Sequence, residues 1–190
     1  MMPAESTRPR LLLITGAPAS GKTRLARELG TRYGCGSCSK DEFKEILFDV
    51  LGTGDAAWSR RLSDASFALL FNLAPRLLGT QELVLLEGNF RAVEHLAPLR
   101  TVLERSAAAA AQVLCVAAPA TRAARLAQRA ADPARHPGHR DPEFPVGAGE
   151  TATFLELPGP RVCFNSEADW HAEVAACCTQ LDRWLSPAKV

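Results

Sequence analysis

The stretch from Gly16 to Thr23 reads Gly-Ala-Pro-Ala-Ser-Gly-Lys-Thr and matches the pattern G-x-x-x-x-G-K-[ST] in full. Small residues let such a stretch wrap closely around an anion, and its backbone N–H groups then point inward to a phosphate. The lysine of the pattern reaches the β- and γ-phosphates of a nucleotide, and the hydroxyl that follows is placed to ligate Mg²⁺. We therefore predict a nucleotide site formed by Gly16, Ala17, Pro18, Ala19, Ser20, Gly21, Lys22 and Thr23.

The sequence favours ATP over GTP as the nucleotide. Proteins that switch on GTP recognise guanine with an Asn-Lys-x-Asp segment. No asparagine here is followed by lysine, because Asn72, Asn89 and Asn165 precede Leu, Phe and Ser. The loop around Asn165 and Ser166 follows the last expected strand, so we expect the adenine of ATP to lie against this loop.

Two acidic residues are placed where phosphoryl transfer needs carboxylates. Asp41 follows Ser39 and Lys40 at the end of the second expected strand, and open α/β sheets bind ligands at the carboxyl ends of their strands. Asp41 is therefore our candidate for the base that accepts the proton of an attacking hydroxyl. The alternative is an acid that complements the dipole in the first turn of a helix. Glu87 follows the apolar run 83–86 in the position of a Walker B carboxylate, and we expect it to hold Mg²⁺ directly or through water.

Arginines gather between the fourth and fifth expected strands. Arg122, Arg125 and Arg129 recur at intervals of three and four residues, so one helix face carries three guanidinium groups. The basic run continues through Arg135, His136, Pro137, Gly138, His139 and Arg140. A solvated basic face is the alternative for each arginine taken alone. Together they predict a lid that closes positive charge over a transferring γ-phosphoryl group, where one arginine is worth about 10³–10⁵ in rate.

Short apolar runs alternate with helical stretches along the chain. The apolar runs predict strands at 10–15, 35–39, 83–86, 112–117 and 161–164. Helix-forming composition predicts helices at 22–33, 121–131 and 169–185. A further helix is expected from Ser39 as N-cap to about Val50, and another from Trp58 to the helix-breaking residues Pro75 and Gly79. One more helix has Pro98 in its first turn and runs to about Ala109. Strands alternating with helices predict an α/β fold, a parallel sheet with helices on both faces.

Three segments carry more detailed expectations. Trp58, Leu62, Ala65, Leu69 and Leu73 repeat at spacings of three and four residues, which predicts the apolar face of their helix. The alanine run 107–111 is explained by the high helix propensity of alanine, so we expect helix there. Residues 132–149 contain four prolines and three glycines, so we expect a loop or flap there.

Length and charge limit what the chain can be. The 190 residues fit one domain at 10–190, with a flexible tail at 1–9 and a lid at about 119–150. The net charge of +1 provides no excess to hold a long nucleic acid by counterion release. No apolar run approaches the ~20 residues that cross a bilayer, and the N-terminal residues lack a signal-peptide core. We expect a cytoplasmic protein without a membrane partner that acts as a monomer or homodimer.

The lysines and cysteines are also informative. Lys22, Lys40, Lys44 and Lys189 are the lysines of this chain, against eighteen arginines, which makes a lysine beside a candidate site more significant. Cys35 and Cys38 form a C-x-x-C without a second ligand pair at suitable spacing for structural zinc. We expect the six cysteines to be reduced and to pack as small apolar side chains.

Taken together, the motifs resemble the P-loop small kinases that include chloramphenicol phosphotransferase, the 5′-hydroxyl polynucleotide kinase domain and the zeta-toxin kinases. The resemblance extends from about Arg10 to Leu185 and rests on GAPASGKT at 16–23, SKDEFKEILFD at 39–49, LLEGNFR at 85–91 with His95 and Pro98 beyond it, and R-x-x-x-R followed by RHPGH within 125–139. It implies a P-loop NTPase fold with a five-stranded parallel sheet in the order 2-3-1-4-5. It also implies ATP-dependent transfer of phosphate to a hydroxyl group, with Asp41 as catalytic base, Lys22 and Thr23 as ATP–Mg²⁺ ligands, and the arginines from 122 to 135 as the lid.

Three functions are compatible with these features. The first is a kinase for a hydroxyl group of a small molecule, with acceptor-binding residues Asp41, Trp58, Asn89, Arg91, His95 and Arg135. The second is a polynucleotide 5′-hydroxyl kinase that holds backbone phosphates with Arg60, Arg61 and the lid, against which the neutral charge argues. The third is a nucleotide-binding regulatory module that hydrolyses ATP slowly and has no acceptor.

Overall fold

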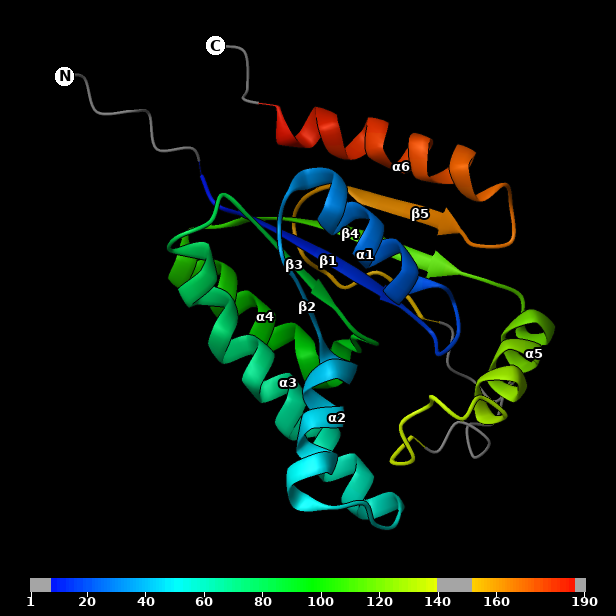
Figure 1. Ribbon diagram of the computed structural model, residues 1–190. Helices are drawn as coiled ribbons and strands as arrows, with labels where there is room; N and C mark the ends of the chain where they lie inside the picture. Colours follow the sequence, from blue (N-terminus) through cyan, green and yellow to red (C-terminus); the bar gives the residue numbers. More distant parts are fainter. Residues whose placement is uncertain (1–7, 140–151, 187–190) are drawn as a thin grey trace.

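Five parallel strands form the centre of the computed structural model, which describes residues 8–139 and 152–186 (Figure 1). Their order across the sheet is β2-β3-β1-β4-β5. This result confirms the predicted parallel sheet and its strand order. The strands are β1 (Arg10–Gly16), β2 (Ser37–Ser39), β3 (Leu83–Glu87), β4 (Ala109–Val116) and β5 (Arg161–Asn165).

The middle strand, β1, shows why the sheet is buried on both faces. Leu11 lies opposite Val84 of β3 and Ala110 of β4, so β1 is paired along both sides. Its residues 11–15 are all buried, as expected for a strand that is covered by helices above and below. Because all five strands are parallel, the residues that follow β1, β2 and β3 lie at one edge of the sheet.

Helices cover both faces of the sheet. Figure 1 shows α1 and α6 on one face and α3 and α4 on the other. Leu12 belongs to the core beneath α1 and α6, whereas its neighbour Leu13 belongs to the core beneath α3 and α4. The helices are α1 (Lys22–Tyr33), α2 (Lys40–Leu51), α3 (Ala56–Leu78), α4 (Ala92–Ser106), α5 (Pro119–Ala130) and α6 (Trp170–Leu185).

Caps set the ends of the helices that matter for the site. Gly34 follows α1 with a φ of 61°, the left-handed conformation that favours glycine, which confirms it as the C-cap. Ser39 is the N-cap of α2, and its Oγ accepts a hydrogen bond from the backbone N–H of Asp41. Asp169 accepts from the backbone N–H of Ala172 in the same way at the start of α6.

The helix predicted for the alanine run 107–111 is wrong. Ala107 takes a left-handed φ of 48° just after α4, and β4 begins at Ala109. Ala110 and Ala111 are buried and paired with β1 in the centre of the sheet. Helix propensities differ by less than about 1 kcal/mol for most residues, so pairing and burial in the sheet outweigh them here.

Two prolines lie further inside their helices than predicted. Pro75 lies within α3, which continues to Leu78, and Pro98 lies in the middle of α4 rather than in its first turn. A proline removes one helical hydrogen bond, and packing of both helices against the sheet compensates for that loss. The buried face of α3 also differs from the predicted stripe, because Leu69 is 46% exposed. The buried side chains are Leu62, Ser66, Phe67, Leu70, Ala74 and Leu78.

The segment after α5 forms turns at 132–139, without helix or strand. This part agrees with the predicted loop. The rest of the predicted loop, including Arg140, lies outside the described residues, as do residues 1–7 of the predicted tail. Within the described part of the chain, no helix combines the length and the apolar character needed to cross a membrane.

Candidate active site

The loop between β1 and α1, here called the phosphate loop (Gly16–Gly21), has a backbone that suits glycine. φ is 93° at Gly21, and Ala19 also has a positive φ of 61°. A Cβ atom at Gly16 would lie 2.5 Å from the carbonyl oxygen of Cys115 and from Oγ of Ser20. The motif glycines are therefore required by close packing as well as by conformation. The loop leads directly into the N-terminus of α1, where anions bind favourably.

Buried oxygen atoms without partners surround this loop. Oγ1 of Thr15, Oγ of Ser20 and Oε1 of Glu87 are buried and accept or donate no hydrogen bond among the described residues. Buried polar atoms in proteins are normally paired. Three such atoms at the carboxyl edge of the sheet indicate a place built to receive polar groups, and they fit the phosphates of a nucleotide with its Mg²⁺ ion.

Hydroxyl groups from two elements converge on the carboxylate of Glu87. Ser39 Oγ donates to Glu87 Oε2 at 2.7 Å, and Thr23 Oγ1 donates to the same oxygen at 3.4 Å. Lys22 Nζ lies along the phosphate loop, where it donates to the carbonyl oxygen of Ala17 at 3.3 Å. Burial has the largest effect on Glu87 and raises the pKa of its carboxyl group, although Lys22 and the Ser39 hydrogen bond act in the opposite direction.

Asp41 lies in the first turn of α2 and forms an ion pair with the neighbouring Lys40, whose Nζ is 3.0 Å from Asp41 Oδ1. The Lys40 side chain is almost fully buried, whereas that of Asp41 is 42% exposed. Desolvation would raise the pKa of Asp41, but the positive charges of Lys40 and Lys22 outweigh it, so the pKa of this carboxyl lies below its ordinary value. Asp41 is therefore a charged carboxylate that solvent or a ligand can reach.

Arg125 joins the phosphate loop to the loop after β5. It donates to the carbonyl oxygen of Ala19, and to Oγ and the carbonyl oxygen of Ser166, at 2.8 to 3.1 Å. Arg122 is half-buried on the same helix, α5. Asn165 is exposed at the end of β5, and its Oδ1 accepts from the backbone N–H of Glu167. The Asn165 side chain is thus part of a turn, next to the residue that Arg125 contacts.

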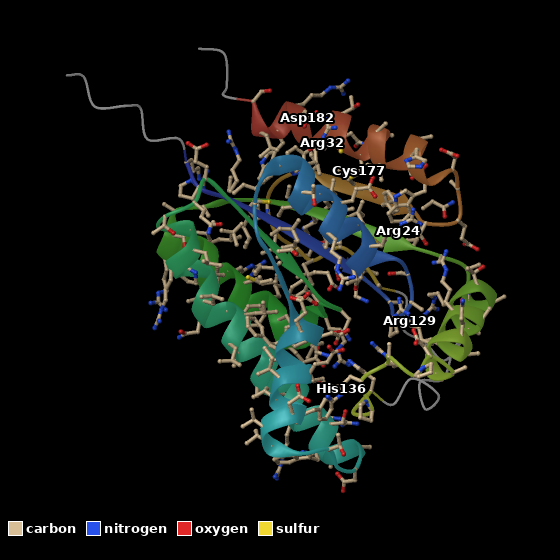
Figure 2. All side chains as sticks on the ribbon, in the orientation of Figure 1. Arg24, Arg32, Arg129, His136, Cys177 and Asp182 are labelled. Atoms are coloured by element: carbon tan, nitrogen blue, oxygen red, sulfur yellow. The ribbon has the colours of Figure 1, made fainter. Side chains whose placement is uncertain are left out.

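A cavity of about 620 Å³ lies along α1 and α2, and Thr23, the last residue of the nucleotide motif, is part of its lining. It brings together several of the residues that the sequence singled out, including Thr23, Asp41, Arg129 and Arg135. In Figure 2, Arg24 extends from α1 and Arg129 from α5. The Arg24 guanidinium lies over the Trp170 ring, 3.7 Å from its centre, which orients this side chain. The lining residues are Thr23, Arg24, Arg27, Glu28, Thr31, Ser39, Asp41, Glu42, Glu45, Arg129 and Arg135.

The other expected acceptor-binding residues lie outside the lining of this cavity. Trp58 donates through Nε1 to the carbonyl oxygen of Gly52 and closes the turn between α2 and α3. Asn89 is half-buried just after β3. Arg91 is the N-cap of α4, and its backbone N–H donates to Nδ1 of His95 at 2.8 Å.

His95 is buried in a cluster of aromatic rings. Its ring centre is 3.8 Å from that of Phe67, and Phe71 and Phe90 lie around it. Burial lowers the pKa of His95 to about 4, so the ring is neutral near pH 7. A neutral ring in an aromatic core is suited to holding the start of α4.

Comparison with known proteins assigns the chain to a family. Residues 11–141 match the family AAA_33, which is described as an AAA domain. The chain belongs to this family. A solved structure of a candidate kinase from Chloroflexus aurantiacus J-10-fl is 31% identical to this chain, with a TM-score of 0.82, and the match covers 90% of this chain and 98% of the other. None of the curated protein sequences matches the chain.

More distant structures share the fold of this AAA domain. A sugar kinase from Janibacter sp. HTCC2649 is 15% identical with a TM-score of 0.56, over 92% of this chain and 95% of its own. A gluconokinase from Sinorhizobium meliloti 1021 is 16% identical with a TM-score of 0.52, over 93% of each chain. The family match and the structure from Chloroflexus aurantiacus confirm the resemblance to P-loop small kinases that the four motifs predicted, and the two distant structures agree with it in fold.

Sequence reasoning missed the partners that organise the AAA-domain site. Ser39 was expected as a helix cap at the end of the second strand, but its hydrogen bond to Glu87 was not predicted. Lys40 was noted as a rare lysine next to Asp41 at the sheet edge, but its ion pair with Asp41 was not predicted. A serine at the end of one strand and a glutamate at the end of another give no local signal of contact, because the pairing of β2 with β3 brings them together.

Proposed function

We propose that the protein is an ATP-dependent kinase that transfers the γ-phosphoryl group to a hydroxyl group of a small molecule. One observation carries this proposal: Thr23 of the nucleotide motif and the charged carboxylate of Asp41 line the same cavity. The relative with 31% identity, described as a candidate kinase, supports it.

In this proposal the phosphate loop binds the phosphates of ATP, and Lys22 contacts the β- and γ-phosphates. Asp41 accepts the hydrogen of the acceptor hydroxyl group. The acceptor oxygen forms a bond to the γ-phosphorus while the bond from that phosphorus to the β–γ bridging oxygen breaks. The proton passes to Asp41, and ADP leaves with the electron pair. A weakly basic carboxylate suits a loose transition state, in which the protein mainly positions and stabilises charge.

Two residues are suited to hold Mg²⁺. When bound, Mg²⁺ neutralises charge on the phosphates of ATP. Thr23 offers a hydroxyl and Glu87 a carboxylate with an unpartnered Oε1, both oxygen ligands of the kind that Mg²⁺ prefers. Ser39 holds the other oxygen of Glu87, so the carboxylate has a defined orientation.

The arginines of α5 divide into two roles in this proposal. Arg125 contacts Ala19 and Ser166 and so holds the phosphate loop in shape beside the expected adenine position. Arg129 lines the cavity, as does Arg135 after the helix, and both supply positive charge to the cavity that Asp41 also lines. Arg122 adds a third guanidinium to the same helix.

The cavity suits a small polar acceptor. Its volume of about 620 Å³ is within the usual range of small-molecule sites, about 300–1,000 Å³. Arginines and glutamates both line it, so an acceptor with several polar groups finds partners of either charge.

The proposal is tested with labelled ATP and a panel of hydroxyl-bearing metabolites, antibiotics and 5′-hydroxyl oligonucleotides. Asp41→Asn is expected to reduce transfer to the acceptor by about 10²- to 10⁴-fold, the usual contribution of a general base. Its affinity for Mg·ATP in calorimetry should stay within about twofold, because Asp41 contacts the hydroxyl group.

Lys22→Ala is expected to weaken the binding of ATP or of the transition state, in contrast to Asp41→Asn, which should leave ATP affinity nearly unchanged. Loss of a charge-assisted contact to phosphate costs about 1.5–3 kcal/mol in ATP or transition-state binding. Arg32→Ala, an exposed position on the same helix, serves as the control and should behave as wild type. Unchanged transfer in Asp41→Asn would exclude Asp41 as the base. ATP turnover without any acceptor would favour a regulatory ATPase.

A further inference from the structure

The turn segment 132–139 lies against α2, the helix that carries Asp41. Figure 1 shows this segment below α5, on the side where α2 lies, and Figure 2 labels His136 on it. Nε2 of His136 is 3.0 Å from Oδ1 of Asp49, and Nε2 of His139 is 2.6 Å from Oε1 of Glu45. Asp49 and Glu45 are one helical turn apart on α2, so the two histidines contact the same face of that helix.

The ring of Phe48 lies between these two contacts. His136 stacks on it with ring centres 5.5 Å apart and an angle of 17°, and His139 meets it edge-on at 6.3 Å. The backbone of Gly138 packs directly on the ring, since a Cβ atom there would lie within 3.0 Å of ring atoms of Phe48. Phe48 is almost completely buried, and Nζ of Lys44 lies 5.2 Å from the centre of the same ring.

The hydrogen bonds of His136 define which of its ring nitrogens donates and which accepts. The backbone N–H of Gly138 donates to Nδ1 of His136 at 3.0 Å. Nδ1 is therefore an acceptor, and Nε2 carries the hydrogen that Asp49 accepts. The backbone N–H of His139 donates to the carbonyl oxygen of His136, which holds the turn in shape. The contact between the segment 132–139 and α2 thus consists of specific hydrogen bonds together with the tightly packed ring of Phe48.

The segment spans the two sides of the cavity. Glu45 lies one turn after Asp41 on α2, and both line the cavity. Arg129 at the end of α5 and Arg135 in the segment line it as well, and Nη1 of Arg135 is 3.8 Å from Oε1 of Glu45. We propose that Arg135–His139 forms a clasp that fastens the end of α5 to α2 and thereby positions Arg129 and Arg135 opposite Asp41.

The positioning role rests on the proposed kinase function, whereas the clasp itself can be tested without it. Gly138→Ala adds a methyl group against the Phe48 ring and changes no charge. Gly36→Ala is the matched control, because no atom lies within 4 Å of the added Cβ position. Asp49→Ala is a second variant at an exposed position, where the side chain is 70% exposed and, within the described part of the chain, its ion pair with His136 is lost.

Hydrogen exchange of the full chain, followed by mass spectrometry, measures whether the clasp is closed. We expect peptides that cover 132–139 to exchange at least about tenfold faster in Gly138→Ala and at least about threefold faster in Asp49→Ala, with β1 and α1 unchanged. Gly36→Ala should exchange as wild type. Wild-type exchange of 132–139 in both variants would overturn the clasp.

The acceptor found in the labelled-ATP screen tests the positioning role. In Gly138→Ala we expect the KM for that acceptor to rise at least about fivefold, while the KM for ATP stays within about twofold. An unchanged acceptor KM together with faster exchange would overturn the positioning role. Faster exchange in a protein for which no acceptor is found would support the clasp and count against the proposed kinase function.

Discussion

At the scale of single residues, two carboxylates in one site carry opposite pKa shifts. Asp41 has a pKa below its ordinary value because two lysine charges outweigh its desolvation, whereas burial raises the pKa of Glu87. Asp41 is therefore ready to accept a hydrogen bond from a hydroxyl group. Glu87 would be stabilised in its charged form by a cation, which agrees with the roles proposed for the two groups.

The charge of Lys40 is the largest favourable influence on Asp41, so Lys40→Met should raise the pKa of the Asp41 carboxyl. The wild-type carboxylate is expected to be charged at every pH above its ordinary value of 3.8, and the stability that its ion pair contributes is lost only as pH falls below that value. Carbon-13 NMR titration of the Asp41 carboxyl in both proteins measures the shift. Arg32→Met is the control, and an unchanged pKa in Lys40→Met would contradict the assignment.

At the scale of elements, α2 joins the chemistry to the clasp. Asp41, Glu45 and Asp49 follow one another at intervals of four residues, so one stripe of this helix presents three carboxylates. The first carboxylate pairs with Lys40, and the other two contact His139 and His136. A movement of the segment 132–139 relative to α2 therefore changes the surroundings of Asp41.

The pKa of His139 reports whether the clasp is closed. Burial lowers this pKa below 6.5, although Glu45 and Asp41 act in the opposite direction and Arg135 adds to the lowering. A histidine with a lowered pKa stabilises the closed clasp fully above pH 6.5, and this contribution decreases as pH falls below that value. In NMR titrations, we expect the His139 pKa to lie below 6.5 in wild type and to return toward 6.5 in Gly138→Ala. Equal pKa values in the two proteins would contradict a clasp that opens.

At the scale of the whole molecule, two cores share one central strand. Leu12 packs beneath α1 and α6, and Leu13 packs beneath α3 and α4. Both side chains are completely or almost completely buried. The phosphate loop follows directly after this strand, so the packing on both faces of the sheet supports its position.

We propose that residues 10–190 unfold as a single domain, which Leu12→Ala and Leu13→Ala can test. Each change is expected to reduce the free energy of unfolding by about 2–5 kcal/mol, the usual cost of a buried leucine. Urea unfolding followed by tryptophan fluorescence and by circular dichroism should give one coincident transition in both variants. Separate transitions for the two probes in either variant would show that the two faces fold independently.

The sequence by itself determined the nucleotide motif and most of the buried strands. Buried strands have continuous apolar runs, and a phosphate-binding turn needs glycines and a lysine at set spacing, so 10–15, 83–86 and Gly16–Thr23 were recognisable locally. The parallel direction of the strands also followed from their alternation with helices, and the family resemblance implied their order. The alanine run was misassigned, because only sheet pairing decides that Ala110 and Ala111 form a strand.

Only the tertiary structure decided which side chains meet at the edge of the sheet. The pairs Ser39–Glu87 and His139–Glu45 join residues that are 48 and 94 positions apart, and no local spacing relates them. The same holds for His95, whose place in an aromatic cluster depends on how α3 and α4 pack. Local sequence encodes conformation through propensities and periodicity, whereas contacts between distant elements depend on the packing of the whole chain.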